Sequence, residues 1–170
     1  MANNYLFNST YSDEWYTDQP TVDLAISLLK IKRVSRVICP FDTDKSLFVQ
    51  TLQKQGHFVI YGITDFLESN SYEFDYLITN PPFSVKNKVI GKVYEYRKPS
   101  LLMLPLDAVA GVHRTSLYKT FGFPHIMIPS KRISYFDENY VKRPASNFHS
   151  IYAMFNTGQS GIEWLDVAAS

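Results

Sequence analysis

Two kinds of segment alternate along most of the chain. Short apolar runs rich in β-branched residues, typical of buried strands, alternate with segments whose apolar residues recur at helical spacing. The predicted strands cover 34–41, 57–63, 74–80 and 99–106, and the predicted helices cover 19–32, 46–56, 85–98 and 108–121. Because strands that alternate with helices form parallel sheets covered on both faces, the pattern predicts an α/β fold.

Two further strand-like runs follow, at 125–136 and 147–156. No helical segment separates them, so we expect them to be antiparallel. The 170 residues suffice for one domain with a sizeable core and are few for two, so we predict a single domain over 1–170. Within it we expect residues 1–18 to form an N-terminal arm and residues 157–170 to form a loose tail.

Composition narrows the class of protein. With 45% hydrophobic and 19% charged residues, the chain is typical of a globular protein rather than a disordered one. Its single cysteine, Cys39, excludes an internal disulfide framework and a cysteine-rich zinc site, and we expect no metal. The first residues lack a signal-peptide pattern and no apolar run approaches the length of a membrane span, so we expect a cytoplasmic protein without membrane contact.

The net charge of +1 hides an uneven distribution. Residues 1–80 carry six Lys or Arg against ten Asp or Glu, whereas residues 81–170 carry eleven against six. A basic half is expected of a protein with a polyanionic partner, and an ordinary solvated surface explains the same asymmetry. Charge alone therefore leaves the partner open.

The ends of the predicted strands are the expected place for a ligand. In an open α/β sheet, ligands bind beyond the carboxyl ends of the strands, near the point where the strand order reverses. These ends fall at 40–42, 61–66, 80–83 and 105–107. We therefore expect the functional site at these four segments.

The segment "TNPPFS" (79–84) has groups suited to holding a planar amine. The residue before each proline is kept out of the helical region, so Asn80-Pro81-Pro82 should leave the strand as a stiff extended segment. An exocyclic amino group would donate to the Asn80 amide oxygen and the Pro81 carbonyl while its ring stacks on Phe83, which localises the nitrogen lone pair. A strand-terminating turn with Phe83 in the core explains the same residues.

Several segments in the same order carry a family resemblance. "DYLITNPPFS" resembles the Asp/Asn/Ser-Pro-Pro-Tyr/Phe motif that follows the fourth strand of S-adenosylmethionine-dependent amino methyltransferases. "SDEWYTDQPTVDLAISLL", "VICPFDTDKSLFVQTLQKQGHFVI", "GITDF" and "IPSKRISYF…SNFHSIYAMF" resemble segments of the small phage-type N6-adenine DNA methyltransferases. The resemblance implies S-adenosylmethionine as cofactor and a Rossmann-like methyltransferase fold, with a mainly parallel sheet, C-terminal antiparallel strands and helices on both faces.

The same resemblance implies roles for individual residues. The target amino group would be held, and its base stacked after leaving the DNA stack, by Asn80, Pro81, Pro82 and Phe83. Nine residues would border the cofactor. Its methionine part would be bordered by Pro40, Phe41, Asp42 and Ser46, its adenine by Asp65 and Phe66, and its other wall would be formed by Tyr16, Thr17 and Asp18. Cys39 precedes a proline at a strand end, and we expect it to be a buried structural cysteine rather than a nucleophile.

Three features depart from the family pattern. "CPFDTDKS" (39–46) contains no glycine, where most enzymes of the class have a Gly-rich turn that lets the backbone approach the cofactor. "HFVIYGITDF" has no carboxylate before Asp65, although an acid at the end of the second strand usually binds the ribose hydroxyls. No segment is left for a separate target-recognition domain, so we expect specificity to come from loops such as 107–124 and 136–147.

Two classes of function stay open. The first is an amino methyltransferase acting on adenine in DNA or, by the same chemistry, on RNA or a glutamine side chain. In it, phosphate would be contacted by six basic residues, namely Lys86, His113, Arg114, Lys119, Lys142 and Arg143. The second is a methyltransferase-like protein without turnover, for example a phage product that binds a host defence protein in the host cytoplasm. A homodimer also stays open.

Overall fold

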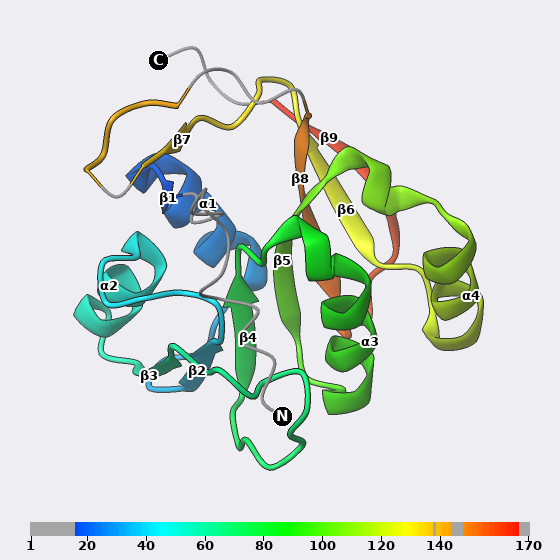
Figure 1. Cartoon of the computed structure of the whole chain (residues 1–170), viewed down its shortest axis with the longest axis horizontal. Helices are drawn as coiled ribbons and strands as arrows, with labels where there is room; N and C mark the ends of the chain where they lie inside the picture. Colours follow the sequence, from blue (N-terminus) through cyan, green and yellow to red (C-terminus); the bar gives the residue numbers. More distant parts are fainter. Residues whose placement is uncertain (1–15, 138, 144–147, 167–170) are drawn as a thin grey trace.

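The computed structural model is described here over residues 16–137, 139–143 and 148–166. Seven strands form the central sheet: β2 (Arg36–Cys39), β3 (Phe58–Tyr61), β4 (Tyr76–Thr79), β5 (Ser100–Pro105), β6 (His125–Pro129), β8 (Ser150–Phe155) and β9 (Gly161–Leu165). Their order across the sheet is β3-β2-β4-β5-β8-β6-β9 (Figure 1). A separate two-stranded ribbon pairs β1 (Tyr16–Thr17) with β7 (Tyr135–Phe136) in antiparallel fashion.

Helices cover both faces of the sheet, as the alternation predicted. One face packs against α1 (Gln19–Leu29) and α2 (Leu47–Lys54), and the other packs against α3 (Lys86–Tyr96) and α4 (Val112–Phe121) (Figure 1). Two short 3₁₀ turns, η1 (Phe83–Val85) and η2 (Leu106–Val109), follow β4 and β5 directly. The helices α1 to α4 and the strands β2 to β5 match their predicted ranges to within a few residues.

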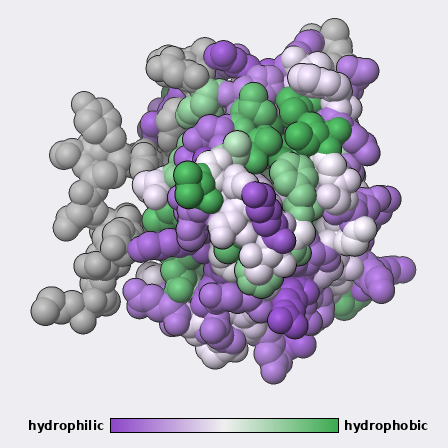
Figure 2. All heavy atoms as spheres, turned by 90° about the vertical axis from the view of Figure 1, so that its right-hand side faces the viewer, coloured by the Kyte–Doolittle hydropathy of each residue, from purple (hydrophilic) through white to green (hydrophobic). Residues whose placement is uncertain are grey.

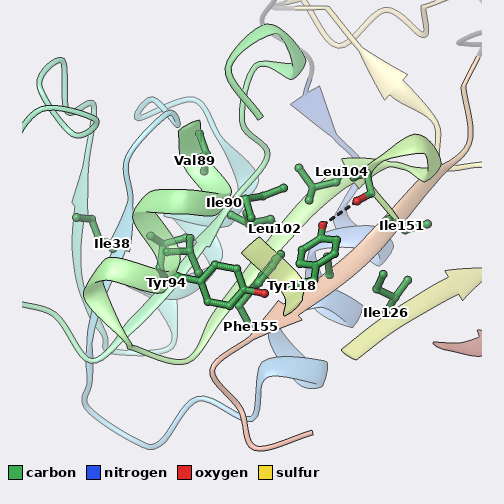
Figure 3. Close-up of a cluster of buried hydrophobic side chains, with 14 of the residues drawn as sticks. Ile38, Val89, Ile90, Tyr94, Leu102, Leu104, Tyr118, Ile126, Ile151 and Phe155 are labelled. Atoms are coloured by element: carbon green, nitrogen blue, oxygen red, sulfur yellow. Dashed lines mark hydrogen bonds between the residues drawn. The ribbon is translucent and has the colours of Figure 1, made fainter. Parts of the chain in front are cut away.

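The central strands β4, β5, β6 and β8 are buried along their whole length, which explains their continuous apolar runs. Along β4, Leu77 packs toward α3, whereas Tyr76 and Ile78 pack toward α1 and α2. Figure 3 shows the cluster on the α3 and α4 side, where Tyr118 points inward and its hydroxyl donates to the Ala108 carbonyl at 2.7 Å. This bond ties α4 to η2, the segment that leaves the end of β5.

The direction of the strands confirms a mainly parallel sheet with antiparallel strands near the C-terminus. β2 runs parallel to both β3 and β4, and β4 runs parallel to β5. β8 is antiparallel to its two neighbours, β5 and β6. The predicted antiparallel relation between the last two apolar runs is therefore correct.

Two expectations about the C-terminal half were wrong. The run 125–136 was expected to be one strand, but Pro129 ends β6, and the chain turns before it pairs with the N-terminal strand as β7. Residues 157–170 were expected to be a loose tail, but Gly161–Leu165 form β9, which lies parallel to β6 at the sheet edge. β9 lies at the end of the sheet beside β6 and exposes Ile162, Glu163 and Trp164, so its sequence lacks the buried apolar run of the central strands.

The face that carries α4 and β9 is a mixture of polar and apolar side chains. Figure 2 shows hydrophobic side chains gathered on this face among hydrophilic ones. The large apolar side chains that α4 and β9 expose are Val112, Phe121, Ile162 and Trp164. Over the described part of the chain, no helix has the length and apolar character required to cross a membrane.

Candidate active site

The strand order reverses between β2 and β4, and this switch point defines the candidate site. From β2 the chain continues to its neighbour β3 on one side, whereas β4 lies on the other side and leads to β5. Because β2 and β4 are parallel, the segments 40–46 and 80–85 that follow them leave the sheet at the same edge. Crevices of this kind hold the ligand in open α/β folds.

Asp42 joins these two segments. Its side chain is buried, and its two carboxylate oxygens accept hydrogen bonds from Ser46 Oγ at 2.8 Å and Thr79 Oγ1 at 2.6 Å. Ser46 in turn accepts from the backbone N–H of Phe48 and caps α2, and Thr79 is the last residue of β4. Burial raises the pKa of the Asp42 carboxyl from 3.8 to about 6, although both hydrogen bonds act to lower it.

The segment 40–46 keeps its shape without glycine. None of its residues has a positive φ, so it does not need the backbone freedom of a Gly-rich turn. The backbone of Asp42 donates to the Cys39 carbonyl at 3.1 Å and accepts from Gly62 N–H at 3.0 Å, and Pro40 accepts from Ile63 N–H at 2.9 Å. Backbone bonds to the end of β3 and the Asp42 side chain therefore shape this turn.

The Asn80-Pro81-Pro82-Phe83 segment leaves β4 at the same edge. Pro82 has φ −57° and ψ 129°, close to the polyproline II conformation, so the chain is extended there as the two prolines predicted. Asn80 and Phe83 are half-buried, and Pro81 is buried. Phe83 begins η1, which leads directly into α3, so the loop is short and anchored at both ends.

Phe83 contacts a second aromatic residue that the sequence analysis did not single out. The ring centroids of Phe83 and Phe148 lie 4.6 Å apart with the planes at 83°, and Tyr135 lies 6.2 Å from Phe148. Phe148 precedes β8, whose antiparallel direction brings its start to the edge where β5 ends. The ring of Phe83 is thus packed against Phe148 and is not in the main core cluster.

The N-terminal ribbon lies against the turn after β2. The Tyr16 hydroxyl is 3.4 Å from Thr43 Oγ1, and its ring lies 5.9 Å from that of Tyr140, whose hydroxyl donates to the Lys45 carbonyl at 2.9 Å. Tyr16 and Thr17 are both buried, and the Thr43 contact places Tyr16 beside the turn after β2. The next residue, Asp18, accepts from Thr21 N–H at 3.0 Å and caps α1.

The predicted adenine-side residues, Asp65 and Phe66, have different environments. Asp65 is exposed and accepts a hydrogen bond from the Tyr72 hydroxyl, which raises the pKa of Tyr72 to about 12. Phe66 is 1% exposed, with its ring stacked 5.7 Å from Tyr96 and edge-on to Phe41 at 5.8 Å. The Asp65 carboxylate is therefore accessible from solvent, whereas Phe66 belongs to the core.

Two of the six basic residues predicted to bind phosphate make internal contacts. The Arg114 guanidinium donates to Asn87 Oδ1 at 2.8 Å and to the carbonyls of Asp107, at 2.9 Å, and Ala110. Lys86 Nζ lies 3.2 Å from Asp107 Oδ2. These contacts tie α3, η2 and the start of α4 together beside the Asn-Pro-Pro-Phe loop.

The other predicted basic residues differ in exposure. His113, Lys119 and Lys142 are exposed, and Arg143 is half-buried. Lys142 lies in the turn after β7, where Phe136 and Lys142 form an antiparallel bridge. These four basic residues therefore lie on two separate elements, α4 and the segment after β7.

Thr79 and Phe148 are the two residues of this site that sequence reasoning missed. Thr79 was quoted as the start of "TNPPFS", but nothing local to the sequence indicates that its hydroxyl reaches Asp42, 37 residues away. Phe148 was part of a predicted strand, and only the sheet order brings it to Phe83. An aromatic residue at the start of an antiparallel strand near the switch point is the signal that would have found it.

Comparison with known proteins places the fold in a class. No family model and no curated protein sequence matches the chain. A chain from a type I R-M system superposes on 96% of it with a TM-score of 0.66 and 13% identity. A modification subunit of a putative type I restriction enzyme from Vibrio vulnificus covers 95% at a TM-score of 0.56 and 11% identity. A putative class I S-adenosylmethionine-dependent methyltransferase from Listeria monocytogenes covers 95%, with a TM-score of 0.54 and 11% identity.

The fold is therefore the Rossmann-like α/β fold of class I S-adenosylmethionine-dependent methyltransferases. The chain spans about half the length of the two type I chains, 47% of one and 49% of the other. The third of these structures, the Listeria protein, is covered over 68% of its length. At these identities the likeness concerns the fold, and the chemistry of the site has to be argued from its own residues.

Proposed function

We propose that this protein is an amino methyltransferase that transfers a methyl group from S-adenosylmethionine to the N6 amino group of adenine in DNA. The observation that carries the proposal is the position of the Asn-Pro-Pro-Phe loop. It leaves β4 at the switch point, joined to the segment after β2 through Thr79 and Asp42. The proposal is that the Asn80 and Pro81 oxygens and the Phe83 ring act at this position, because open α/β folds bind ligands at the switch point.

The residues at the switch point include carboxylates that suit the positive charge of the proposed cofactor. When bound, S-adenosylmethionine supplies a methyl group on a positively charged sulfur. Asp42 holds a carboxylate in the turn after β2, and Asp65 presents an exposed carboxylate that would accept from the adenine amino group. The segment 40–46, which has only negative φ values, would border the methionine part together with Tyr16 and Thr17.

On the substrate side, the chain's own groups prepare the amine. The Asn80 side-chain oxygen and the Pro81 carbonyl would accept the two amine hydrogens, and the ring of Phe83 would stack on the base. Because both hydrogens are held, the nitrogen lone pair is localised and would form the new nitrogen–carbon bond as the bond between the methyl carbon and the sulfur breaks. The sulfur would keep that electron pair as a neutral thioether, and the surplus proton on the nitrogen would leave to solvent. Phe148, packed on Phe83, would hold that ring in place when a base enters.

DNA is proposed as the polymer because of the charge and the neighbouring folds. The segment after residue 80 carries eleven Lys or Arg against six Asp or Glu, and His113, Lys119 and Lys142 are exposed. Two of the solved structures that share the fold come from type I restriction systems, and one of these is a modification subunit. RNA and protein glutamine are the competing substrates, since the same loop suits any planar amine or amide.

The test is a transfer assay with radiolabelled S-adenosylmethionine and four acceptors: duplex DNA, single-stranded DNA, RNA and a protein extract. We expect label in DNA, recovered as N6-methyladenine after digestion. Replacing Asn80 by Ala should lower transfer by at least about 100-fold with the fold retained by circular dichroism. The exposed Asn70, whose side chain accepts from Lys92, is the matched control for an Asn to Ala change.

Three outcomes separate the alternatives. Label in RNA or protein alone would retain the chemistry and change the substrate. Label in none of the acceptors, with no cofactor binding by calorimetry, would refute the proposal in favour of a non-catalytic binding protein, such as a phage product directed at a host defence protein. Full activity in Asn80→Ala would refute the role of the loop. Sedimentation of the protein alone and with duplex DNA would decide between a monomer and the expected alternative, a homodimer.

A further inference from the structure

Thr79 and Asp42 form a buried hydrogen bond between two different strand ends. Thr79 is fully buried and is bonded through its carbonyl carbon to Asn80, so any shift of Thr79 moves the Asn-Pro-Pro-Phe loop. Its hydroxyl donates to Asp42 Oδ2 at 2.6 Å, and the second oxygen of Asp42 is held by Ser46 at 2.8 Å. The loop that would hold the amine is thus connected, through one side chain, to the turn that would border the cofactor.

We propose that Thr79 and Asp42 are a positioning pair, which sets the distance between the reacting amine and the methyl donor by tying the Asn80 loop to the 40–46 turn. The inference rests on the proposed function, because it names the part that these two residues play in the transfer. Neither residue needs to touch the reacting atoms. In-line transfer is sensitive to placement, since a displacement of about 1 Å in an active site can lower the rate about 100-fold.

A purely structural role explains the arrangement less well. A buried carboxylate that stays ionised is costly, and its pKa is raised to about 6 for that reason. An amide side chain, which can pair with both hydroxyls without a charge, would stabilise the same turn better. The hydroxyls that reach Asp42 come from the N-cap of α2 and the end of β4, on either side of the switch point. The carboxylate therefore holds together the two segments between which a transferred methyl group would have to pass.

Among the described residues, the titratable groups around Asp42 are one thiol, two exposed charged side chains and two tyrosines. The Cys39 thiol has a pKa raised well above its usual value, first by burial and then by Asp42, so it is neutral wherever Asp42 titrates. Asp44 and Lys45 lie in the same turn and are exposed. Two tyrosines pack on the turn, Tyr16 beside Thr43 and Tyr140 on the Lys45 carbonyl.

The test replaces the hydroxyl without changing the shape of the side chain. Thr79→Val keeps the branched side chain and removes the donor, Thr79→Ser keeps the donor, and Ser100→Ala is the control. Ser100 is equally buried, and its hydroxyl donates to the Lys98 carbonyl at the opposite end of a strand. Each variant is assayed for kcat against pH, for cofactor affinity by calorimetry, and for the pH titration of the Asp42 carboxyl carbon by NMR.

We expect Thr79→Val to lower kcat about 10- to 100-fold and to change cofactor affinity by less than about threefold. Because the Thr79 hydrogen bond lowers the pKa of Asp42, its loss should move the acid limb of the kcat profile and the NMR titration of Asp42 together to higher pH. Thr79→Ser should restore both, and Ser100→Ala should leave both unchanged. An unchanged kcat, or a lower kcat with an unmoved titration, would overturn the inference.

A wild-type protein without transfer activity would refute the proposed function by itself. The coupling of the two segments by Thr79 and Asp42 would then be tested by amide hydrogen exchange at Phe83 and Ser84, measured in the wild type and in Thr79→Val. Faster exchange there and a shifted Asp42 titration would show that the bond couples the two segments, whatever ligand they serve. Unchanged exchange would overturn the coupling as well.

Discussion

The substitution Asp42→Asn should make the protein more stable at neutral pH. Asp42 is buried, and its pKa rises from 3.8 to about 6 on folding, chiefly because burial disfavours the ionised form. Each unit of difference between the folded and unfolded pKa is worth about 1.4 kcal/mol, so the ionised carboxylate lowers the free energy of unfolding above pH 6 by about 3 kcal/mol. An amide of the same shape can accept from one hydroxyl and donate to the other, and it carries no charge.

The sign of the pH dependence follows from the raised pKa. Below pH 3.8, Asp42 is protonated in both the folded and the unfolded chain, so the charge has no effect on stability. As the pH rises toward 6, the unfolded chain loses the proton first, and the wild type loses stability relative to the variant. The stability difference in favour of Asp42→Asn should therefore widen by about 2 kcal/mol between pH 4 and pH 8.

Urea unfolding followed by circular dichroism at several pH values measures this difference directly. Asp44→Asn, a change in an exposed residue of the same turn, is the matched control and should show no comparable widening. A difference between Asp42→Asn and the wild type that stays constant from pH 4 to pH 8 would refute the reasoning. If Thr79 and Asp42 position the two segments, Asp42→Asn should be more stable than the wild type and less active, because active-site residues are often kept at a cost in stability.

Three further predictions follow from particular contacts. Gly111→Ala should destabilise the fold by about 1–2 kcal/mol, because Gly111 has φ +127° and an added Cβ would lie 2.6 Å from Arg114 Nη2. Gly91→Ala in α3 should stabilise the fold, because its added Cβ meets no atom within 4 Å. Equal urea midpoints for the two variants would contradict this. Phe148→Ala should weaken binding of duplex DNA with 2-aminopurine at the target position by about tenfold, seen as a lower fluorescence change, and a wild-type signal would remove Phe148 from the site. Lys142→Ala should reduce the slope of DNA affinity against salt by about one, and an unchanged slope would show that this exposed lysine contacts no phosphate.

Much of the fold was predictable because its central strands are buried on both faces. Their apolar runs are continuous, and the helices between them have an apolar stripe, so periodicity located most elements. It did not locate β9, whose Glu163 and Trp164 are exposed at the sheet edge, and it did not separate β6 from β7. β7 and β9 form because they pair with strands far away in the sequence, β1 and β6, and a local pattern carries no information about such pairing.

Some features of the candidate site were likewise predictable from the sequence, and others depend on the sheet. The prolines of the Asn80 loop restrict their own backbone, so the extended conformation found at Pro82 was predictable from the residues themselves. The absence of glycine in 40–46 was read as a departure from the family, but the structure shows a turn that needs no positive φ. What replaces glycine there is a set of bonds to β3 and β4, and those depend on the sheet.

By itself, the sequence determined the succession of strands and helices and the stiffness of the loop after β4, because both arise from interactions over a few residues. Only the tertiary structure decided which groups meet at the switch point. Asp42 and Thr79 are 37 residues apart, and they are in contact because β2 and β4 are neighbours in the sheet. A buried carboxylate needs partners, and in this chain the strand order supplies them.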